Sequence, residues 1–227
     1  ILGTVLTLGA VQVRSNVNPR SPLQDMWQGL TYVWKMPALL SAFWIAFLFN
    51  LTVYPFTLGL LPYVAKNIYM IDQTGLGLLV ASFSIGGLLG SISLSFWGHL
   101  VKVGRIMLIG CALWHFFLLL FGQSENLTIG ILLLCCAGYA QNICSVPMFV
   151  MMLKQSEESY RGRVMGIRML AIYGLPMGLL IAGALIDQIG FQLTNLILII
   201  AGLITLSLIA LIWRKDLIDA SAPANQN

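Results

Sequence analysis

The chain has 227 residues, of which 59% are hydrophobic and only 9% carry a charge, and its mean hydropathy is +0.89. Charged residues make up about a quarter of an ordinary soluble domain, so this composition excludes a soluble globular protein and a disordered tail. A soluble nucleic-acid binder is excluded as well, because the net charge of +4 comes from only 12 Lys and Arg against 8 Asp and Glu. The sequence therefore predicts an all-α, polytopic membrane protein.

Two segments precede the main apolar region. Residues 1–13 form an apolar run that is shorter than the roughly 20 residues a spanning helix needs, and we interpret it as the end of a helix. After a polar stretch, Ser21 and Pro22 favour a helix that begins at Pro22. Apolar residues then recur at helical spacing, which predicts an amphipathic helix in the headgroup plane: Leu23, Met26, Trp27, Leu30, Val33 and Trp34. Residues 14–37 are thus expected to form a linker.

Six longer apolar stretches follow, each near the length of a membrane span. They cover residues 38–62, 75–97, 106–122, 127–153, 165–186 and 191–213. We expect helix bends at Pro55, Pro147 and Pro176, because proline removes a backbone donor. The sequence therefore predicts a six-helix bundle over residues 38–213, followed by a polar tail over residues 214–227.

The basic residues indicate the orientation of these spans. Of the 12 Lys and Arg residues, all but Lys66 fall on one side when the predicted spans alternate across the bilayer. Cytoplasmic loops carry the excess of Lys and Arg in membrane proteins. We therefore expect the linker, the loop over residues 98–105, the region over residues 154–168 and the tail to be cytoplasmic.

Several short motifs carry a family resemblance. They are NLTVYP at 50–55 with LLPYVA at 60–65, GLGLLVA at 75–81, GGLLG at 86–90, WGHLVKVGR at 97–105, YRGRVMG at 160–166, and GLPMG at 174–178 with GALIDQIG at 183–190. Together they resemble the later helices of the major facilitator superfamily, most like the branch with the enterobactin exporter and the transmembrane secretion effectors. The loop with Gly98, Gly104 and Arg105 is one residue shorter than the family's loop motif and lacks its Asp.

The resemblance implies a place for this chain within a larger carrier. Residues 1–13 would be the end of transmembrane helix six, and residues 14–37 would join two six-helix halves. The implied partners are an N-terminal six-helix half, the lipid bilayer of a bacterial inner membrane and a small-molecule substrate. The expected function is secondary active efflux of hydrophobic or amphipathic molecules by alternating access. The alternative is a membrane scaffold without transport activity, or an inactive truncated half.

Polar residues inside the spans are the candidate substrate-binding groups. Asn50, Tyr54 and Thr57 fall at i, i+4, i+7 spacing and are predicted to share one helix face. Gln141 and Asn142 form a second candidate in the fourth span. His115 is titratable and well inside a span, which favours a transport or proton role. The alternative for each is a structural hydrogen bond between helices.

Loop residues form a set of candidate gating residues, and small residues in the spans form a set of candidate packing residues. The candidate gating residues of the loops are Gly98, Gly104, Arg105, Arg161, Arg163 and Asp187. For the arginines the alternative is simple anchoring at the cytoplasmic surface. The candidate packing residues are Gly86, Gly90, Gly174 and Gly178, whose spacing lets two helix backbones approach closely. Such faces pack, and they can also be the faces that move during alternating access.

Catalytic and metal chemistry lack support in the sequence. His99 and His115 lack the full set of carboxylates or thiols that a metal site or a catalytic triad needs, so we expect no enzyme, no metal and no cofactor. No acidic residue lies within the six stretches. A carboxylate that couples transport to protons is therefore expected in the N-terminal half, unless His115 has that role.

Overall fold

The structure, a computed structural model, describes residues 22–97 and 102–219. Within these residues every regular element is a helix. Five helical segments are long and apolar enough to span a membrane, and a bent helix pair raises the number to six. Four of the five are α5 (Gln73–Trp97), α6 (Val103–Gln123), α7 (Leu127–Gln155) and α10 (Phe191–Ile212). The fifth combines α8 (Arg161–Leu170), the 3-10 turn η4 (Ala171–Tyr173) and α9 (Gly174–Ile189). The prediction of an all-α membrane protein is confirmed.

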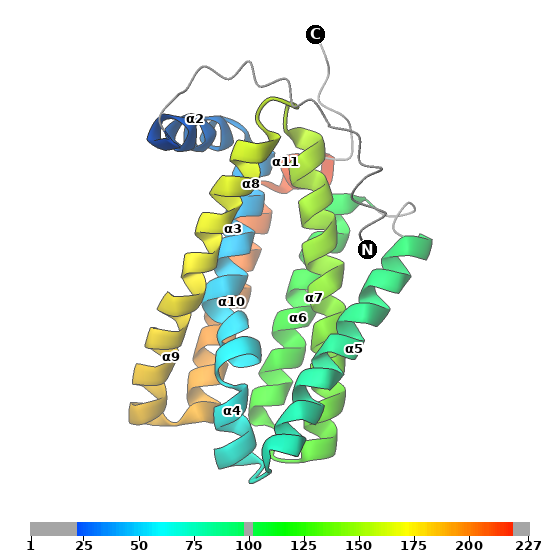
Figure 1. Cartoon of the computed structure of the whole chain (residues 1–227), viewed down its shortest axis with the longest axis vertical. Coiled ribbons are helices and arrows are strands. Elements are labelled where there is room, and N and C mark those ends of the chain that lie inside the picture. Colours follow the sequence, from blue (N-terminus) through cyan, green and yellow to red (C-terminus); the bar gives the residue numbers. More distant parts are fainter. Residues whose placement is uncertain (1–21, 98–101, 220–227) are drawn as a thin grey trace, which may run out of the picture.

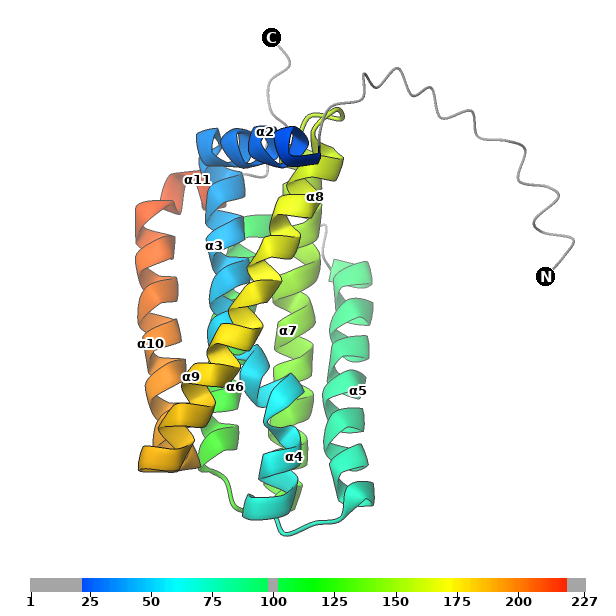
Figure 2. The same ribbon diagram turned by 60° about the vertical axis from the view of Figure 1, so that its left-hand side comes forward.

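Helix α2 (Pro22–Lys35) lies across one end of the bundle (Figures 1 and 2). It begins at Pro22, as the sequence predicts, and it makes an angle of 108° with α3 (Pro37–Thr52). Gly29 and Val33 face the bundle and are buried, whereas Trp27 and Trp34 are 69% and 60% exposed. Exposed tryptophans on a helix perpendicular to the spans suit the interface of a bilayer.

The first span differs most from its prediction over residues 38–62. Helix α3 is followed by a π-helical turn, η1 (Pro55–Gly59), a short helix, α4 (Leu61–Tyr63), and a second π-helical turn, η2 (Val64–Ile68). The amide of Leu60 donates to the carbonyl of Pro55 at 2.8 Å, and Tyr69 donates to Val64 at 3.0 Å. Proline has no N–H to donate, so Pro55 interrupts the regular ladder and wider turns take its place. The helical path therefore continues to Ile68.

The other two prolines act differently. Helix α7 continues through Pro147 as one helix. Pro176 lies in the first turn of α9, directly after η4. A proline ring clashes with the carbonyl four residues before it, and the tighter 3-10 turn relieves that clash. The fifth span starts at Arg161, earlier than the predicted residue 165.

Four helical paths stand side by side at the front of Figure 1: α8–α9, α3–α4, α7 and α5, with α6 and α10 behind them. Helices α5 and α7 touch through glycines. A Cβ at Gly86 would overlap the carbonyl of Cys135, and one at Gly90 would lie 2.7 Å from the carbonyl of Tyr139. Helix α9 meets α3 in the same way, with Gly174 against Phe47 and Gly178 against Leu51. All four predicted packing glycines thus lie at close backbone contacts.

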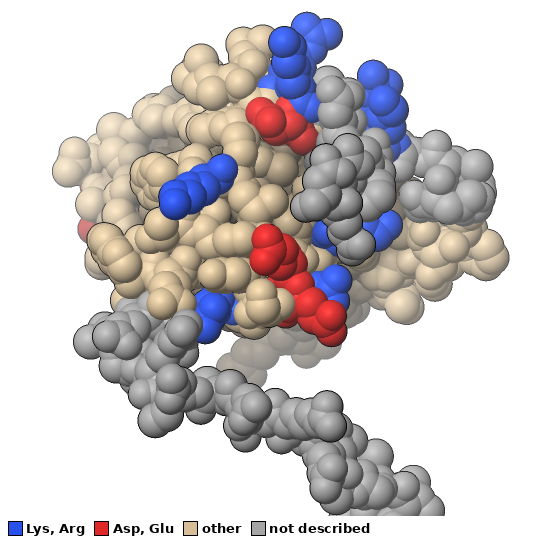
Figure 3. Space-filling model, turned by 90° about the horizontal axis from the view of Figure 1, so that it is seen from above, with Lys and Arg blue, Asp and Glu red and all other residues tan. Residues whose placement is uncertain are grey.

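The two ends of the bundle differ in charge. The end that carries α2 also holds the start of α6, the end of α7, the start of α8 and α11 (Arg214–Asp219), and Figure 3 looks down on it. Its exposed basic residues are Lys35, Lys102, Arg105, Lys154, Arg161, Arg214 and Lys215. Lys66 lies in η2 at the opposite end. The exposed basic residues among those described therefore lie at the two ends of the bundle in the distribution that the predicted topology expects.

Candidate functional site

A chain of hydrogen bonds joins three helices at the middle of the bundle. The side-chain amide of Gln141 donates to the hydroxyl of Tyr54 at 3.1 Å. Asn142 donates to the side-chain carbonyl of Gln141 at 2.9 Å, and Ser91 donates to that of Asn142 at 3.0 Å. Gln141 also lies 3.3 Å from the hydroxyl of Ser145. We call these five residues the polar network.

The aromatic ring of Tyr54 is held from two sides. Its centroid is 4.8 Å from that of Trp114 and 5.5 Å from that of Phe49, both at edge-to-face angles. Trp114 is fully buried, and its indole N–H has no hydrogen-bond partner within the described structure. Tyr54 itself is only partly buried. The two rings therefore fix Tyr54 so that its hydroxyl reaches Gln141 on α7.

Helix α5 approaches α7 closely, so its residue Ser91 joins the polar network. A Cβ at Gly87 would lie 2.6 Å from the amide nitrogen of Asn142, so only glycine leaves room for that amide. The side chains of Ser91, Gln141 and Asn142 remain partly exposed, although Gln141 and Asn142 lie midway along α7. Exposed polar groups at this depth need polar contacts, because the hydrocarbon core offers none.

The predicted stripe of Asn50, Tyr54 and Thr57 does not form as one face. Asn50 is buried, donates to the carbonyl of Ala46 at 2.8 Å and packs against Gly174 of α9. Thr57 is buried in η1, where its hydroxyl lies 3.4 Å from the carbonyl of Tyr54. The regular spacing that underlay the prediction ends at Pro55, where the chain enters the π-helical turn. Only Tyr54 of the three joins the polar network.

His115 lies in a separate, fully buried contact. Its Nε2 is 3.0 Å from the hydroxyl of Thr52, and its Nδ1 is 2.8 Å from the carbonyl of Cys111. Gly202 of α10 faces the pair, since a Cβ there would lie 2.6 Å from Nε2. Among the described residues, no three His, Cys, Asp or Glu side chains are placed to hold a metal ion.

Arg168 lies on α8, inside the segment Arg161–Ile189 that is long and apolar enough to span a membrane. In the sequence it falls at the edge of the region over residues 154–168 that is expected to be cytoplasmic, and within the predicted stretch over residues 165–186. Its guanidinium carbon is 3.5 Å from the ring centroid of Phe149 on α7. Its Nε is buried and has no hydrogen-bond partner within the described structure. The helix that carries Arg168 begins at Arg161, earlier than the apolar pattern suggested.

The candidate gating residues are spread over several contacts. Gly104 is buried against the backbone of Leu217 in α11, with no space for a Cβ. Arg163 lies over the ring of Tyr160 at 5.2 Å, and that ring stacks on Tyr32 of α2 with centroids 4.3 Å apart. Arg105, Arg161 and Asp187 are exposed, and Gly98 lies outside the described residues. The structure thus connects Arg163, through Tyr160, to helix α2.

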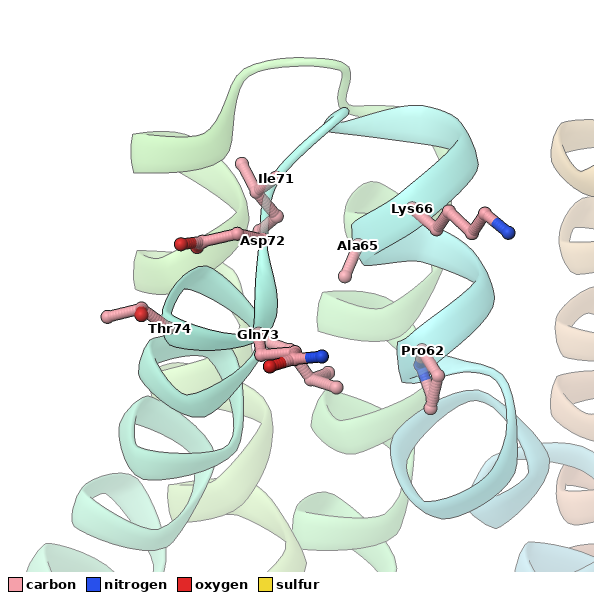
Figure 4. Close-up of a pocket in the computed structure, with 8 residues that line it drawn as sticks. Pro62, Ala65, Lys66, Ile71, Asp72, Gln73 and Thr74 are labelled. Atoms are coloured by element: carbon pink, nitrogen blue, oxygen red, sulfur yellow. The ribbon is translucent and has the colours of Figure 1, made fainter.

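A hollow of about 460 Å³ lies at the opposite end, between η2 and the start of α5 (Figure 4). It is lined by Pro62, Ala65, Lys66, Ile71, Asp72, Gln73, Thr74 and Leu76. Asp72 accepts from the amide of Gly75 at 2.9 Å, and the Lys66 side chain points away from Asp72. The two opposite charges therefore do not form an ion pair across this hollow.

Four residues of this region are not among the sequence-based candidates: Ser91, Trp114, Phe149 and Arg168. Ser91 falls one position after the predicted glycine pair, and nothing in its spacing distinguished it from neighbouring serines. Trp114 and Phe149 looked like ordinary apolar residues. Arg168 had a usable signal, because a charge that follows Met165 and precedes a long apolar run falls within a possible span.

Comparison with known proteins identifies the family. The sequence profile of the Major Facilitator Superfamily matches residues 2–174 and, in a second overlapping match, residues 42–226. No curated protein matches the chain significantly. The profile matches cover nearly the whole sequence and agree with the bundle of apolar helices. The chain therefore belongs to the major facilitator superfamily, a family of membrane transporters.

Proposed function

We propose that this chain is the C-terminal part of a secondary active carrier that exports hydrophobic or amphipathic small molecules by alternating access. The observation that carries the proposal is the polar network of Tyr54, Gln141, Asn142, Ser91 and Ser145. It spans three helices at mid-depth, where substrate sites of such carriers lie. Its members Tyr54, Gln141 and Asn142 are partly exposed rather than sealed in the core.

The chemistry of this surface suits an amphipathic ligand. Amide and hydroxyl groups can orient a polar part of the ligand, while Tyr54 and the surrounding apolar side chains accept its hydrophobic part. A purely structural network would gain most from complete burial, because water competes with exposed hydrogen bonds. The partial exposure therefore favours a surface that exchanges its partners.

The proposal includes a setting for the chain. The linker and the C-terminal tail face the cytoplasm of a bacterial cell, as the positive end of the bundle supports. An N-terminal six-helix half completes the carrier. Transport is outward, as in the exporter branch that the sequence resembles. Protons provide the driving force. The coupling carboxylate lies in the N-terminal half, since the described acidic residues lie at the ends of the bundle.

Transport measurements on the full-length protein test this function. Inverted membrane vesicles are energised, and the uptake of a panel of lipophilic dyes, macrolides and siderophores is followed with and without a collapsed proton gradient. We expect gradient-dependent uptake of at least one compound. Ser91→Ala and Gln141→Leu should raise its KM, whereas Ser207→Ala should not, because Ser207 is an exposed residue of α10 that donates only to its own helix.

Two results would contradict the proposal. If no substitution in the polar network changes the uptake, the polar network does not bind the substrate. No gradient-dependent uptake of any compound, by protein that is correctly inserted, favours the alternative of a scaffold without transport activity.

A further inference from the structure

Arg168 is a positive charge inside an apolar helical segment. It lies seven residues after Arg161, which places it about 10 Å further along the helix axis at 1.5 Å per residue. Within residues 22–97 and 102–219 it forms no ion pair with an acidic side chain. Ionisable residues at such positions face a polar partner or a water-filled path, because the hydrocarbon core cannot solvate them.

The guanidinium lies on the same face of α7 as the polar network. Asn142, Ser145 and Phe149 fall at i, i+3, i+7 spacing, which places them on one side of that helix. Arg168 rests on the ring of Phe149 at 3.5 Å. The positive charge therefore lies between the cytoplasmic end and the network.

Because Arg168 stacks on Phe149, only the N–H groups in the plane of its guanidinium remain available to bind a ligand. A guanidinium that uses its flat face for an aromatic ring keeps its N–H groups free to donate in its own plane. The Nε is buried without a partner, although a buried donor is normally satisfied. A planar fork of N–H groups matches two oxygens of an acid.

We propose that Arg168 binds the acidic group of an amphipathic anionic substrate, such as a carboxylate, sulfonate or phosphate, while the apolar part of that substrate contacts the surface around Tyr54. This inference rests on the proposed function and specifies the charge of the substrate. The same acidic chemistry has a second source, a carboxylate of the N-terminal half, and the experiment separates the two.

The test measures how fast phenylglyoxal modifies individual arginines of the wild-type, full-length protein in neutral detergent. Peptide mass spectrometry follows Arg168, with exposed Arg214 of α11 as the reference. Octanoate and octanamide are the probes, since they share a chain and differ in charge. We expect octanoate to slow the modification of Arg168 by roughly tenfold, as for a charge-assisted pair. It should leave Arg214 unchanged, and octanamide should protect neither residue.

The other outcomes overturn the inference. Equal rates at Arg168 with octanoate and octanamide mean that it does not bind an acid. An Arg168 that resists modification without any probe is not available to an acid from outside the carrier, which also contradicts the inference. Because labelling needs no transport, a carrier that exports no dye would refute the proposed function without affecting this result.

A transport arm extends the test. Rhodamine B carries a carboxylate where rhodamine 6G carries an ester, and the two xanthene dyes differ otherwise only in alkyl groups on the rings and amines. We expect Arg168→Gln to raise the KM for rhodamine B by roughly tenfold and to leave that for rhodamine 6G nearly unchanged. Arg168→Lys should recover part of the loss, because it restores the charge without the planar fork. Equal effects on both dyes contradict the inference.

Discussion

His115 Nε2 and Thr52 Oγ1 lie 3.0 Å apart and join α6 to α3 at the last residue of α3. In the neutral imidazole, Nδ1 donates to the carbonyl of Cys111, so Nε2 accepts the hydroxyl proton of Thr52. The same hydroxyl lies 2.8 Å from the carbonyl of Leu48. It has one proton and can serve only one of these two acceptors at a time. Whether His115 Nε2 can accept this hydrogen bond therefore affects the hydrogen bonding of the backbone just before Pro55, where the helix type changes.

Removing this hydroxyl should weaken the bundle. We expect Thr52→Val to lower the free energy of unfolding by about 0.6 to 1.7 kcal/mol, the range for hydrogen bonds between membrane helices. Thr205→Val is the matched control, since Thr205 is exposed and donates only to Ala201 of its own helix. Denaturant unfolding in mixed micelles measures both variants. A double-mutant cycle with His115→Ala should show coupling, and additive effects would mean that the pair contributes nothing as a pair.

The contact of α5 with α7 depends on glycine at Gly86. A methyl group there would overlap the carbonyl of Cys135 and force the two helices apart. We expect Gly86→Ala to destabilise the protein by about 1 to 3 kcal/mol, as overpacking does. Gly77→Ala on the same helix is the control, because its Cβ would meet nothing within 4 Å. It should be neutral or stabilising, since alanine is the better helix former. Equal thermal stability of both variants would show that α5 and α7 tolerate a wider spacing.

The sequence predicted those parts of the fold that depend on local pattern. Pro22 was recognised as a helix start because its fixed φ and missing donor suit that position, and the spans over α5, α6, α7 and α10 follow from apolar length. The π-helical turns after Pro55 were not predictable, because several helix types can absorb a proline. For the site, Tyr54, Gln141 and Asn142 were found as polar groups in apolar runs. Asn50 was misplaced because its neighbour Gly174 belongs to a distant helix.

The linker helix is held to the transmembrane bundle by Tyr32. Its ring stacks on Tyr160, and its hydroxyl accepts from the backbone amide of Glu157 at 3.1 Å. We expect Tyr32→Phe to keep the stacking but to speed hydrogen exchange at the Glu157 amide. Tyr32→Ala should also increase exchange throughout α2, because both contacts are lost. Hydrogen exchange with mass spectrometry reports the two segments separately. Unchanged protection of α2 in Tyr32→Ala would show that other contacts hold this helix.

The hydroxyl of Tyr54 should contribute to substrate binding separately from its ring. Tyr54→Phe keeps the ring between Trp114 and Phe49 but removes the acceptor of Gln141. Losing one neutral hydrogen bond of about 0.5 to 1.5 kcal/mol raises the KM of a transported compound roughly two- to tenfold, with little change in kcat. Tyr173→Phe is the control, since Tyr173 is 68% exposed on the outer surface of the bundle. A change in kcat alone would place Tyr54 in the conformational cycle rather than in binding.

The charge difference between the two ends predicts the orientation of the whole chain. In a background with all four cysteines replaced by alanine, Lys66→Cys and Lys154→Cys each place one thiol at opposite, exposed ends of the bundle. A membrane-impermeant maleimide should label the first variant in intact cells and the second only after the membrane is opened, because Lys and Arg concentrate on the cytoplasmic side. The reverse pattern would invert the topology. It would also place α2 and its Tyr32 contact at the outer surface of the membrane.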